Sequence, residues 1–167
     1  MSTMTWTAMR RERLKVDDAL DLIDRHRLVS SRAVEAAQQC AALAQSDTWE
    51  IRTDDAKTVA TVFMRETSDP WVATIDVVLQ PKHFRAQDEY RELTRDAFAD
   101  IISEAREMGV GRLVSQVPET RARTMKCLKA AGFKFEGKMR KAVRLGRSKS
   151  REDLYIYALL LEEDGET

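Results

Sequence analysis

One carboxylate in this sequence lies in a setting that suits acid–base chemistry: Asp76, within the apolar run from Val72 to Leu79. A carboxyl group held among apolar residues keeps its proton more tightly than one in water, and a pKa nearer neutrality suits a general base. Asp76 could therefore take a proton from an attacking amine, directly or through water. The alternative, an Asp that points to the solvent edge of a sheet or caps a helix, is the commoner situation.

A second group of candidates follows this run, where Pro81 ends the strand and a helical pattern starts near Ala86. The first N–H groups of a helix lack partners and attract anions such as phosphate. Arg85 could contact a phosphate, whereas Asp88 and Glu89 put two carboxylates where the anion would bind. The segment therefore predicts either an anion site or a helix start that its own carboxylates cap.

The remaining candidates for proton transfer are tyrosines near the end of the chain. Tyr155 and Tyr157 alternate along an apolar run, and Tyr155 could protonate a leaving group. Aromatic residues in such a pattern are more often part of the core. The two histidines and two cysteines are scattered without the spacing of metal ligands, so we predict no metal site.

The chain that must position these residues reads as a single domain over residues 1–167, with mixed α/β structure. Periodicity predicts a central mixed sheet of about six or seven strands, flanked on both faces by about four helices. The strands are expected near residues 5–9, 49–51, 58–65, 72–79, 112–117, 133–143 and 154–161. The helices are expected over residues 16–27, 32–45, 86–108 and 120–131.

The composition is that of a globular protein, 43% hydrophobic and 34% charged, with no apolar run long enough to span a membrane. No signal-peptide pattern opens the sequence, so we expect a cytoplasmic protein with reduced cysteines. Net charge is zero, yet residues 121–151 hold twelve Lys and Arg against one acid, Glu136. This stretch is either a solvated surface or the binding site of an acidic partner, and its few aromatic residues argue against stacking on single-stranded nucleic acid.

With these elements in order, the sequence resembles the GNAT superfamily of N-acetyltransferases. The most specific part of the resemblance is the closing pattern, a helix that ends in Gly132-Phe133, then Glu136-Gly137, then Asp153-Leu154-Tyr155. The run Val77-Val78-Leu79-Gln80-Pro81 is similar to the central strand of that family. The resemblance covers most of the chain and implies a GNAT-like sheet.

The resemblance also implies where acetyl-CoA would bind. Its pantetheine arm would lie along Val78 and Leu79, where this strand splays from its neighbour, and its pyrophosphate would lie on the loop that holds Arg85, Ala86, Gln87, Asp88 and Glu89. Arg121 would lie near the ribose phosphate. The sequence departs from the family at three places: the loop lacks its usual glycines, Arg121 replaces a frequent Asn, and Leu128 replaces the frequent Tyr that protonates the departing thiolate.

These features predict a GNAT fold with a degraded acyl-CoA site, and two functions remain open. The one that we narrowly favour from the sequence is a non-catalytic structural or interaction subunit with no required cofactor, of the kind associated with phage virions. It would have a protein partner or form a homo-oligomer. The alternative is an acetyl-CoA-dependent N-acetyltransferase in which the amine attacks directly and positioning carries most of the catalysis.

Overall fold

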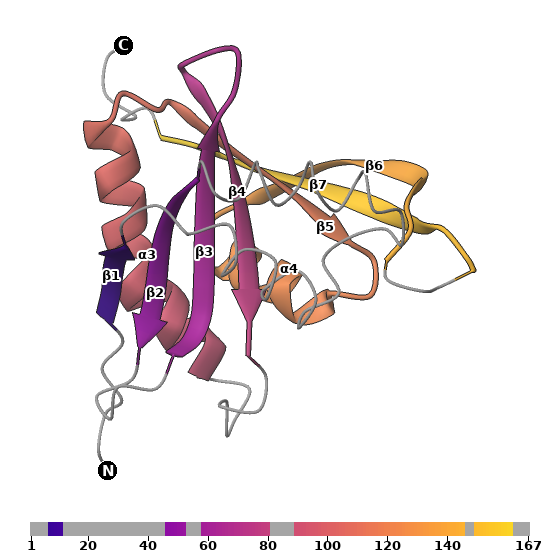
Figure 1. The fold of residues 1–167 in the computed structure, drawn as a ribbon, viewed down its shortest axis with the longest axis horizontal. Coiled ribbons are helices and arrows are strands. Elements are labelled where there is room, and N and C mark those ends of the chain that lie inside the picture. The colour runs from indigo at the N-terminus through magenta and orange to yellow at the C-terminus, as the bar shows by residue number, and fades with distance from the viewer. Residues whose placement is uncertain (1–6, 12–45, 53–57, 81–88, 146–148, 162–167) are drawn as a thin grey trace.

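The computed structural model describes residues 7–11, 46–52, 58–80, 89–145 and 149–161, with the side chains of residues 7–11 and 89–95 not described (Figure 1). The helices expected over residues 16–27 and 32–45 lie outside these ranges. So does the loop with Arg85, Ala86, Gln87 and Asp88, and of Glu89 only the backbone is described. The expectations for these residues stay predictions.

A seven-stranded mixed sheet forms the centre of the molecule, in the order β1-β2-β3-β4-β5-β7-β6. Only β4 and β5 run parallel, and every other neighbouring pair is antiparallel. The strands are β1 (Thr7–Arg11), β2 (Asp47–Arg52), β3 (Thr58–Glu66), β4 (Val72–Leu79), β5 (Arg112–Pro118), β6 (Lys134–Val143) and β7 (Glu152–Leu160). The predicted fold class and strand number are therefore confirmed.

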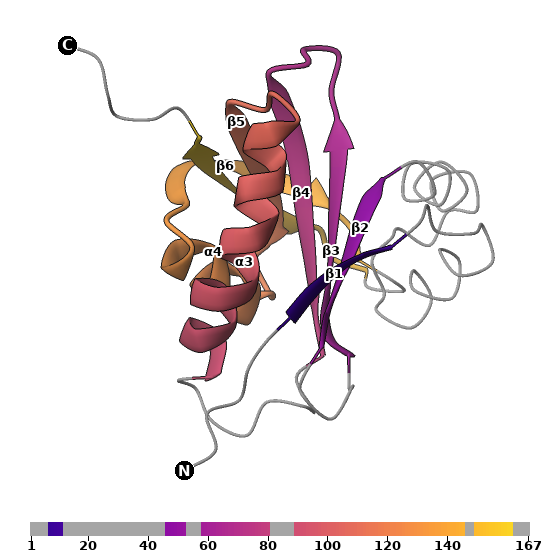
Figure 2. The same cartoon turned by 90° about the vertical axis from the view of Figure 1, so that its left-hand side faces the viewer.

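Two helices, α3 (Glu89–Glu107) and α4 (Ala122–Ala130), lie on one face of this sheet (Figure 2). Both end in the same way, at a glycine in the left-handed region: Gly109 with φ +84° and Gly132 with φ +95°. After α4, the N–H of Phe133 bonds the carbonyl of Leu128 and that of Gly132 bonds Lys129. This paired pattern satisfies the last carbonyls of the helix and turns the chain back toward the sheet.

Apolar side chains of the strands and of these helices form one core. Its largest fully buried members are Trp49, Phe98, Ile51, Met64 and Ile75. On β4, Ala73, Ile75, Val77 and Leu79 alternate toward this core, because successive side chains of a strand point to opposite faces. The intervening residues of β4, including Asp76 and Val78, therefore point to the face opposite the two helices.

The structure corrects several expected boundaries. The last strand begins at Glu152 rather than Leu154, because Glu152 pairs with Val143 across the β6–β7 hairpin. Helix α4 begins at Ala122 rather than Thr120, since the Thr120 hydroxyl bonds the Glu152 carboxylate and the preceding residues form a turn. The last strand is also less buried than its apolar sequence predicts, with Leu160 59% exposed near the end of the described chain.

Candidate functional site

The two parallel strands at the middle of the sheet separate along their length. β4 and β5 pair at Val72 with Arg112, Ala73 with Leu113, and Thr74 with Val114, and within the described residues they do not pair further. At the closed end, the Trp71 carbonyl accepts hydrogen bonds from the N–H groups of both Gly111 and Arg112, at 2.9 and 3.1 Å. Past Thr74 and Val114 the strands splay, as the resemblance implied.

Hydrogen bonds at both ends of β4 show which backbone groups face this splay. The Trp71 carbonyl points toward β5, whereas the Gln80 N–H points the other way and donates to Val59 of β3 at 2.8 Å. Because backbone N–H and C=O groups alternate in direction along a strand, those of Val77 and Leu79 face β5 across the splay. The side chain of Val78, in contrast, points to the face opposite the helices.

The same argument applies to β5. The Arg112 N–H donates to Trp71 on the β4 side, and the Glu119 N–H donates to Asp153 on the β7 side at 3.0 Å. Even-numbered residues of β5 therefore present their backbone to the splay, and among these Pro118 has no N–H to donate. Gln116 thus faces Val77 and Leu79 with a backbone donor and acceptor that no described strand uses.

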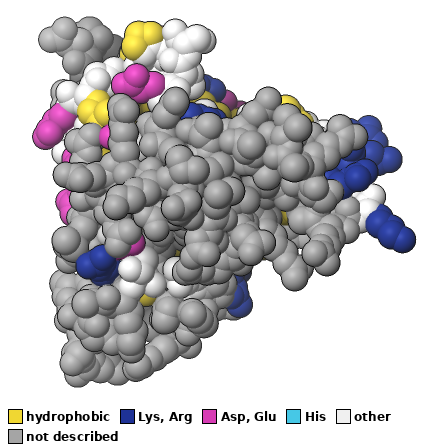
Figure 3. Space-filling model, viewed as in Figure 1, with side chains coloured by type: hydrophobic (Ala, Val, Ile, Leu, Met, Phe, Trp, Pro, Cys, Tyr) yellow, Lys and Arg dark blue, Asp and Glu magenta, His cyan; other side chains and the backbone are white. Residues whose placement is uncertain are grey.

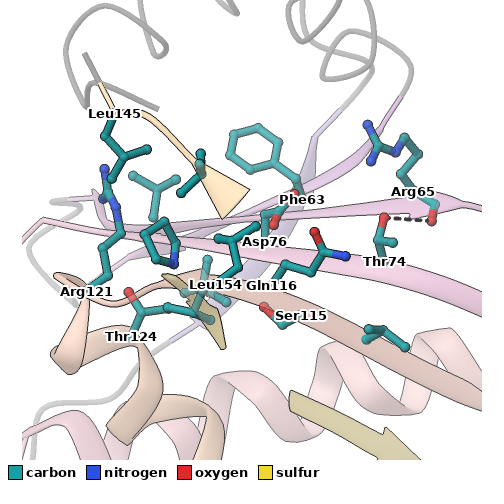
Figure 4. A pocket seen from close by; sticks show the side chains of 16 residues that line it. Phe63, Arg65, Thr74, Asp76, Ser115, Gln116, Arg121, Thr124, Leu145 and Leu154 are labelled. Carbon is teal, nitrogen blue, oxygen red and sulfur yellow. Dashed lines mark hydrogen bonds between the residues drawn. The ribbon is translucent and has the colours of Figure 1, made fainter. Parts of the chain in front are cut away.

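A pocket of about 340 Å³ occupies this splay (Figure 4). Its walls come from the five strands β3 to β7, from the N-terminus of α4 and from the chain after β6. The lining residues are Phe63, Arg65, Thr74, Asp76, Val77, Val78, Val114, Ser115, Gln116, Val117, Pro118, Arg121, Thr124, Val143, Leu145 and Leu154. The described side chains leave the splay open.

Asp76 lies on the wall of this pocket directly opposite Phe63, its partner on β3 (Figure 4). The Asp76 side chain is partly exposed, yet many protein atoms lie around its carboxyl group, and this burial raises the pKa of that group. The positive charge of Arg65 opposes the shift and lowers the pKa. A carboxylate with a raised pKa at the edge of an open cleft is the arrangement expected of a general base.

Two residues with hydroxyl groups line the same pocket from the helix side. Ser115 on β5 is 2% exposed and Thr124 in the first turn of α4 is 7% exposed. Among the described residues, neither hydroxyl has a hydrogen-bond partner. Neither oxygen is among the fully buried atoms that lack a partner, so both reach the pocket, where a polar ligand atom can meet them.

Arg121 precedes α4 and also lines the pocket. Burial lowers its pKa, and the nearby charge of Glu152 raises it, so a guanidinium that stays protonated is held in a partly dehydrated position. The helix that starts after Arg121 has no acidic residue in its first turn. The positive end of α4 and the Arg121 guanidinium therefore meet at this end of the pocket, with the Glu152 carboxylate beside them.

Tyr155 lies elsewhere. It pairs with Val117 of β5 and its ring packs against Phe135, with centroids 5.9 Å apart, while Tyr157 packs against the same ring at 5.7 Å. Lys138 lies over the Tyr155 ring at 5.8 Å. The structure does not place Tyr155 among the residues that line the pocket, and its catalytic role stays a prediction. Leu79 belongs to the core, although its backbone faces the splay.

Of the site residues predicted from the sequence, the fold brings Asp76, Val78 and Arg121 to one pocket, and their roles stay predictions. Ser115, Gln116 and Thr124 line the same pocket and were not predicted. A hydroxyl or amide in an alternating strand or a helix carries no distinctive sequence signal. One indication of Thr124 was present in the sequence. Leu128 replaces the frequent Tyr of the family, and Thr124 lies one turn earlier on the same buried side of α4.

Lys and Arg side chains gather on the edge formed by the β6–β7 hairpin, at the right of Figure 3. Among the basic residues of the β6–β7 hairpin, Lys134, Arg140, Lys141, Lys149 and Arg151 are all exposed. Lys138 pairs with Asp153 at 3.4 Å, and Arg112 pairs with Glu136. The acidic partner expected for this stretch stays a prediction.

Within the described residues, no group of three His, Cys, Asp or Glu is placed to hold a metal ion. The helices that the structure describes include none that is long and apolar enough to cross a membrane.

Comparison with proteins of known structure identifies the fold of this chain. No family model matches the sequence, and no curated protein matches it. Solved structures do match. The ribosomal-protein-S18-alanine N-acetyltransferase of Escherichia coli is 19% identical, with a TM-score of 0.63 over 98% of each chain.

Two further structures extend the likeness. A protein from Salmonella typhimurium that is described as an acetyltransferase was solved with its cofactor acetyl-CoA. It is 17% identical, with a TM-score of 0.66 over 99% of this chain and 98% of that one. A GNAT-family acetyltransferase from Bacillus anthracis is 15% identical, with a TM-score of 0.62 over 94% and 96%. The chain thus has the GNAT fold.

Proposed function

We propose that this protein is an acyl-CoA-dependent N-acyltransferase, with acetyl-CoA as the donor. The observation that carries the proposal is the open splay between β4 and β5, where pairing stops at Thr74 and Val114 and a pocket of about 340 Å³ begins. A protein that had kept the fold only as a scaffold gains nothing from an unfilled cleft in its core, and side chains would be expected to close it.

The residues of the pocket fit the acyl-pantetheine arm of such a donor. The backbone of Val77 and Leu79 on one strand and of Gln116 on the other offers donors and acceptors to its amides. Val78 and Val114 supply apolar walls, and the unpartnered hydroxyls of Ser115 and Thr124 can meet polar atoms. A bound acyl-CoA supplies an activated thioester, whose carbonyl carbon an amine can attack directly.

The protein's own part in this reaction is to position the amine and remove its proton. Asp76 lines the pocket beside Phe63, and a raised pKa makes its carboxylate a stronger base. Phe63 opposite Asp76 offers an aromatic face to a cationic or apolar acceptor. Holding amine and thioester together in the pocket supplies most of the rate enhancement.

The competing proposal, a non-catalytic structural or interaction subunit, has one local observation in its favour. Leu128, where the family frequently has its acid Tyr, is fully buried and absent from the pocket lining. This observation removes one catalytic group and leaves the cleft intact, so we rank the transferase first. The virion association and a homo-oligomeric state remain predictions from the resemblance.

An acyl-transfer assay tests the proposal. Acetyl-CoA is incubated with the protein and a panel of primary amines (amino acids, polyamines, aminoglycosides and N-terminal peptides), and release of the coenzyme A thiol is followed. Transfer to at least one amine, reduced by Asp76→Asn and not by Asp69→Asn in the exposed β3–β4 turn, is the expected result. Full activity of Asp76→Asn would remove Asp76 from the mechanism.

A further inference from the structure

The first turn of α4 contains the hydroxyl group of Thr124, which has had no specific role in the reaction so far. It lines the splay, is 7% exposed, and has no hydrogen-bond partner among the described residues. The Thr124 oxygen is not among the fully buried side-chain atoms that lack a partner, so it reaches the space of the pocket, where it can donate to a ligand atom.

The surroundings of Thr124 favour negative charge. The first bond within α4 runs from the N–H of Met125 to the carbonyl of Arg121, so the N–H groups of Ala122, Arg123 and Thr124 have no acceptor within the helix. No side chain caps these groups, and the first turn has no acidic residue. The guanidinium of Arg121 lies at the same end of the pocket, and the Glu152 carboxylate, which accepts a hydrogen bond from Thr120, offsets part of its charge.

The reaction proposed above creates one negative charge in this pocket. When the amine nitrogen bonds to the carbonyl carbon, the carbon–sulfur bond breaks and its electron pair stays on sulfur as a thiolate. The amine's proton goes to the Asp76 carboxylate, so a separate donor must stabilise the sulfur. Leu128 cannot donate, and Tyr155 packs against Phe135 outside the pocket.

We propose that the Thr124 hydroxyl is the group that binds the thioester sulfur and donates a hydrogen bond to the departing thiolate, helped by the positive end of α4. This inference rests on the proposed function. It makes Thr124 a catalytic residue that acts by stabilising charge, since an alcohol is too weak an acid to lose its proton to a thiolate. The thiolate then takes its proton from solvent.

Binding of coenzyme A tests the inference without any acceptor. The titration of the bound thiol is followed by the ultraviolet absorbance of its thiolate form in the wild-type protein and in Thr124→Val. If Thr124 donates to the thiolate, the variant binds coenzyme A but raises the pKa of the bound thiol by about one unit or more, because a hydrogen bond to a charged group is lost. In the transfer assay the same variant should lose about tenfold to hundredfold in kcat, with little change in KM.

Two further variants make the outcome specific. Thr48→Val removes a buried hydroxyl from β2, away from the pocket, where it donates to the Ser46 carbonyl, and should leave the thiol pKa unchanged. Ser115→Ala removes the other hydroxyl of the pocket. A larger effect from Ser115→Ala than from Thr124→Val would place the sulfur at β5 and overturn the inference, as would an unchanged thiol pKa in Thr124→Val.

The proposed function fails in a different way from this inference. If coenzyme A does not bind to the wild-type protein, both are overturned. If coenzyme A binds and Thr124→Val titrates like the wild type, the transferase proposal stands and only the role of Thr124 is lost.

Discussion

Thr74 on β4 and Val114 on β5 are the last two residues through which the parallel strands pair, and the candidate site begins immediately beyond them. Both side chains line the pocket that opens there. A parallel pair whose ladder stops inside a sheet leaves backbone donors and acceptors without partners, and such groups need a ligand or water. The interrupted pairing therefore connects the fold to its proposed function.

The pH dependence of transfer should report Asp76. Burial raises the pKa of this carboxyl, so the acid limb of the kcat/KM profile should lie above the ordinary range of an aspartate, with the rate rising as Asp76 loses its proton. Asp76→Asn should lower kcat by about 10²–10⁴-fold and abolish this limb. A wild-type limb that persists in Asp76→Asn would assign the titration to another group.

Replacing Asp76 should lower the rate of transfer but raise the stability of the fold at neutral pH. A carboxyl whose pKa is higher in the folded than in the unfolded state binds more protons when folded, so stability falls as pH rises from the unfolded pKa through the folded one. At neutral pH, Asp76→Asn should therefore unfold at a higher temperature than the wild type, and the difference should shrink below the unfolded pKa. Thermal denaturation at several pH values measures it.

Arg65 should influence the pH dependence of transfer through the pKa of Asp76. Its positive charge lowers the pKa of Asp76 against the effect of burial. Removing the charge in Arg65→Gln should move the acid limb of the rate profile to higher pH, while Arg52→Gln on β2, whose guanidinium pairs with Glu50, serves as a charge-matched control. A shift to lower pH in Arg65→Gln would contradict the assignment.

The closed end of the splay depends on Gly111. A Cβ at this position would lie 1.8 Å from the Trp71 indole Nε1, although the half-exposed ring can partly move away. Gly111→Ala should therefore destabilise the fold by about 1–2 kcal/mol. Gly137→Ala on β6, where nothing lies within 4 Å, should cost less than about 0.5 kcal/mol in chemical denaturation. Equal effects of the two variants would contradict tight packing at Trp71.

The β6–β7 hairpin contains a second local constraint, at Lys141. This residue has φ +48°, and its N–H donates to the Asp153 carboxylate at 2.7 Å. Lys141→Gly relieves the left-handed conformation and should change stability by no more than about 1 kcal/mol, in the stabilising direction. The hydrogen bond from Lys141 lowers the pKa of Asp153 in the folded protein. The stabilisation that this hydrogen bond provides is therefore present above the unfolded pKa of Asp153 and is lost as pH falls through the folded pKa. In thermal denaturation at several pH values, Asp153→Asn should remove this loss of stability at acid pH.

Much of the fold could be predicted because its signals are local. The apolar runs of β3 and β4 and the glycines that end α3 and α4 each reflect a constraint within a few neighbouring residues. Strand ends were less predictable: Glu152 and Asp153 belong to β7 because of partners on β6 and β5, which sequence patterns do not reveal.

The site was harder to predict for a related reason. Asp76 stood out as a charge in an apolar run, and Arg121 through the resemblance. Thr124 and Gln116 become notable only when the pairing of β4 with β5 stops and exposes them to the pocket. That interruption depends on contacts between strands far apart in the sequence.

Calorimetric titration of coenzyme A and acetyl-CoA tests the central claim most directly. We expect dissociation constants in the micromolar range or tighter for the wild-type protein. Val114→Phe, which fills the open splay, should abolish binding, whereas Val72→Phe, at a half-buried valine on the same face of the paired end, should keep it. Absence of heat with the wild type at high ligand concentration, or equal binding by Val114→Phe, would contradict the proposal that the splay is an acyl-CoA site.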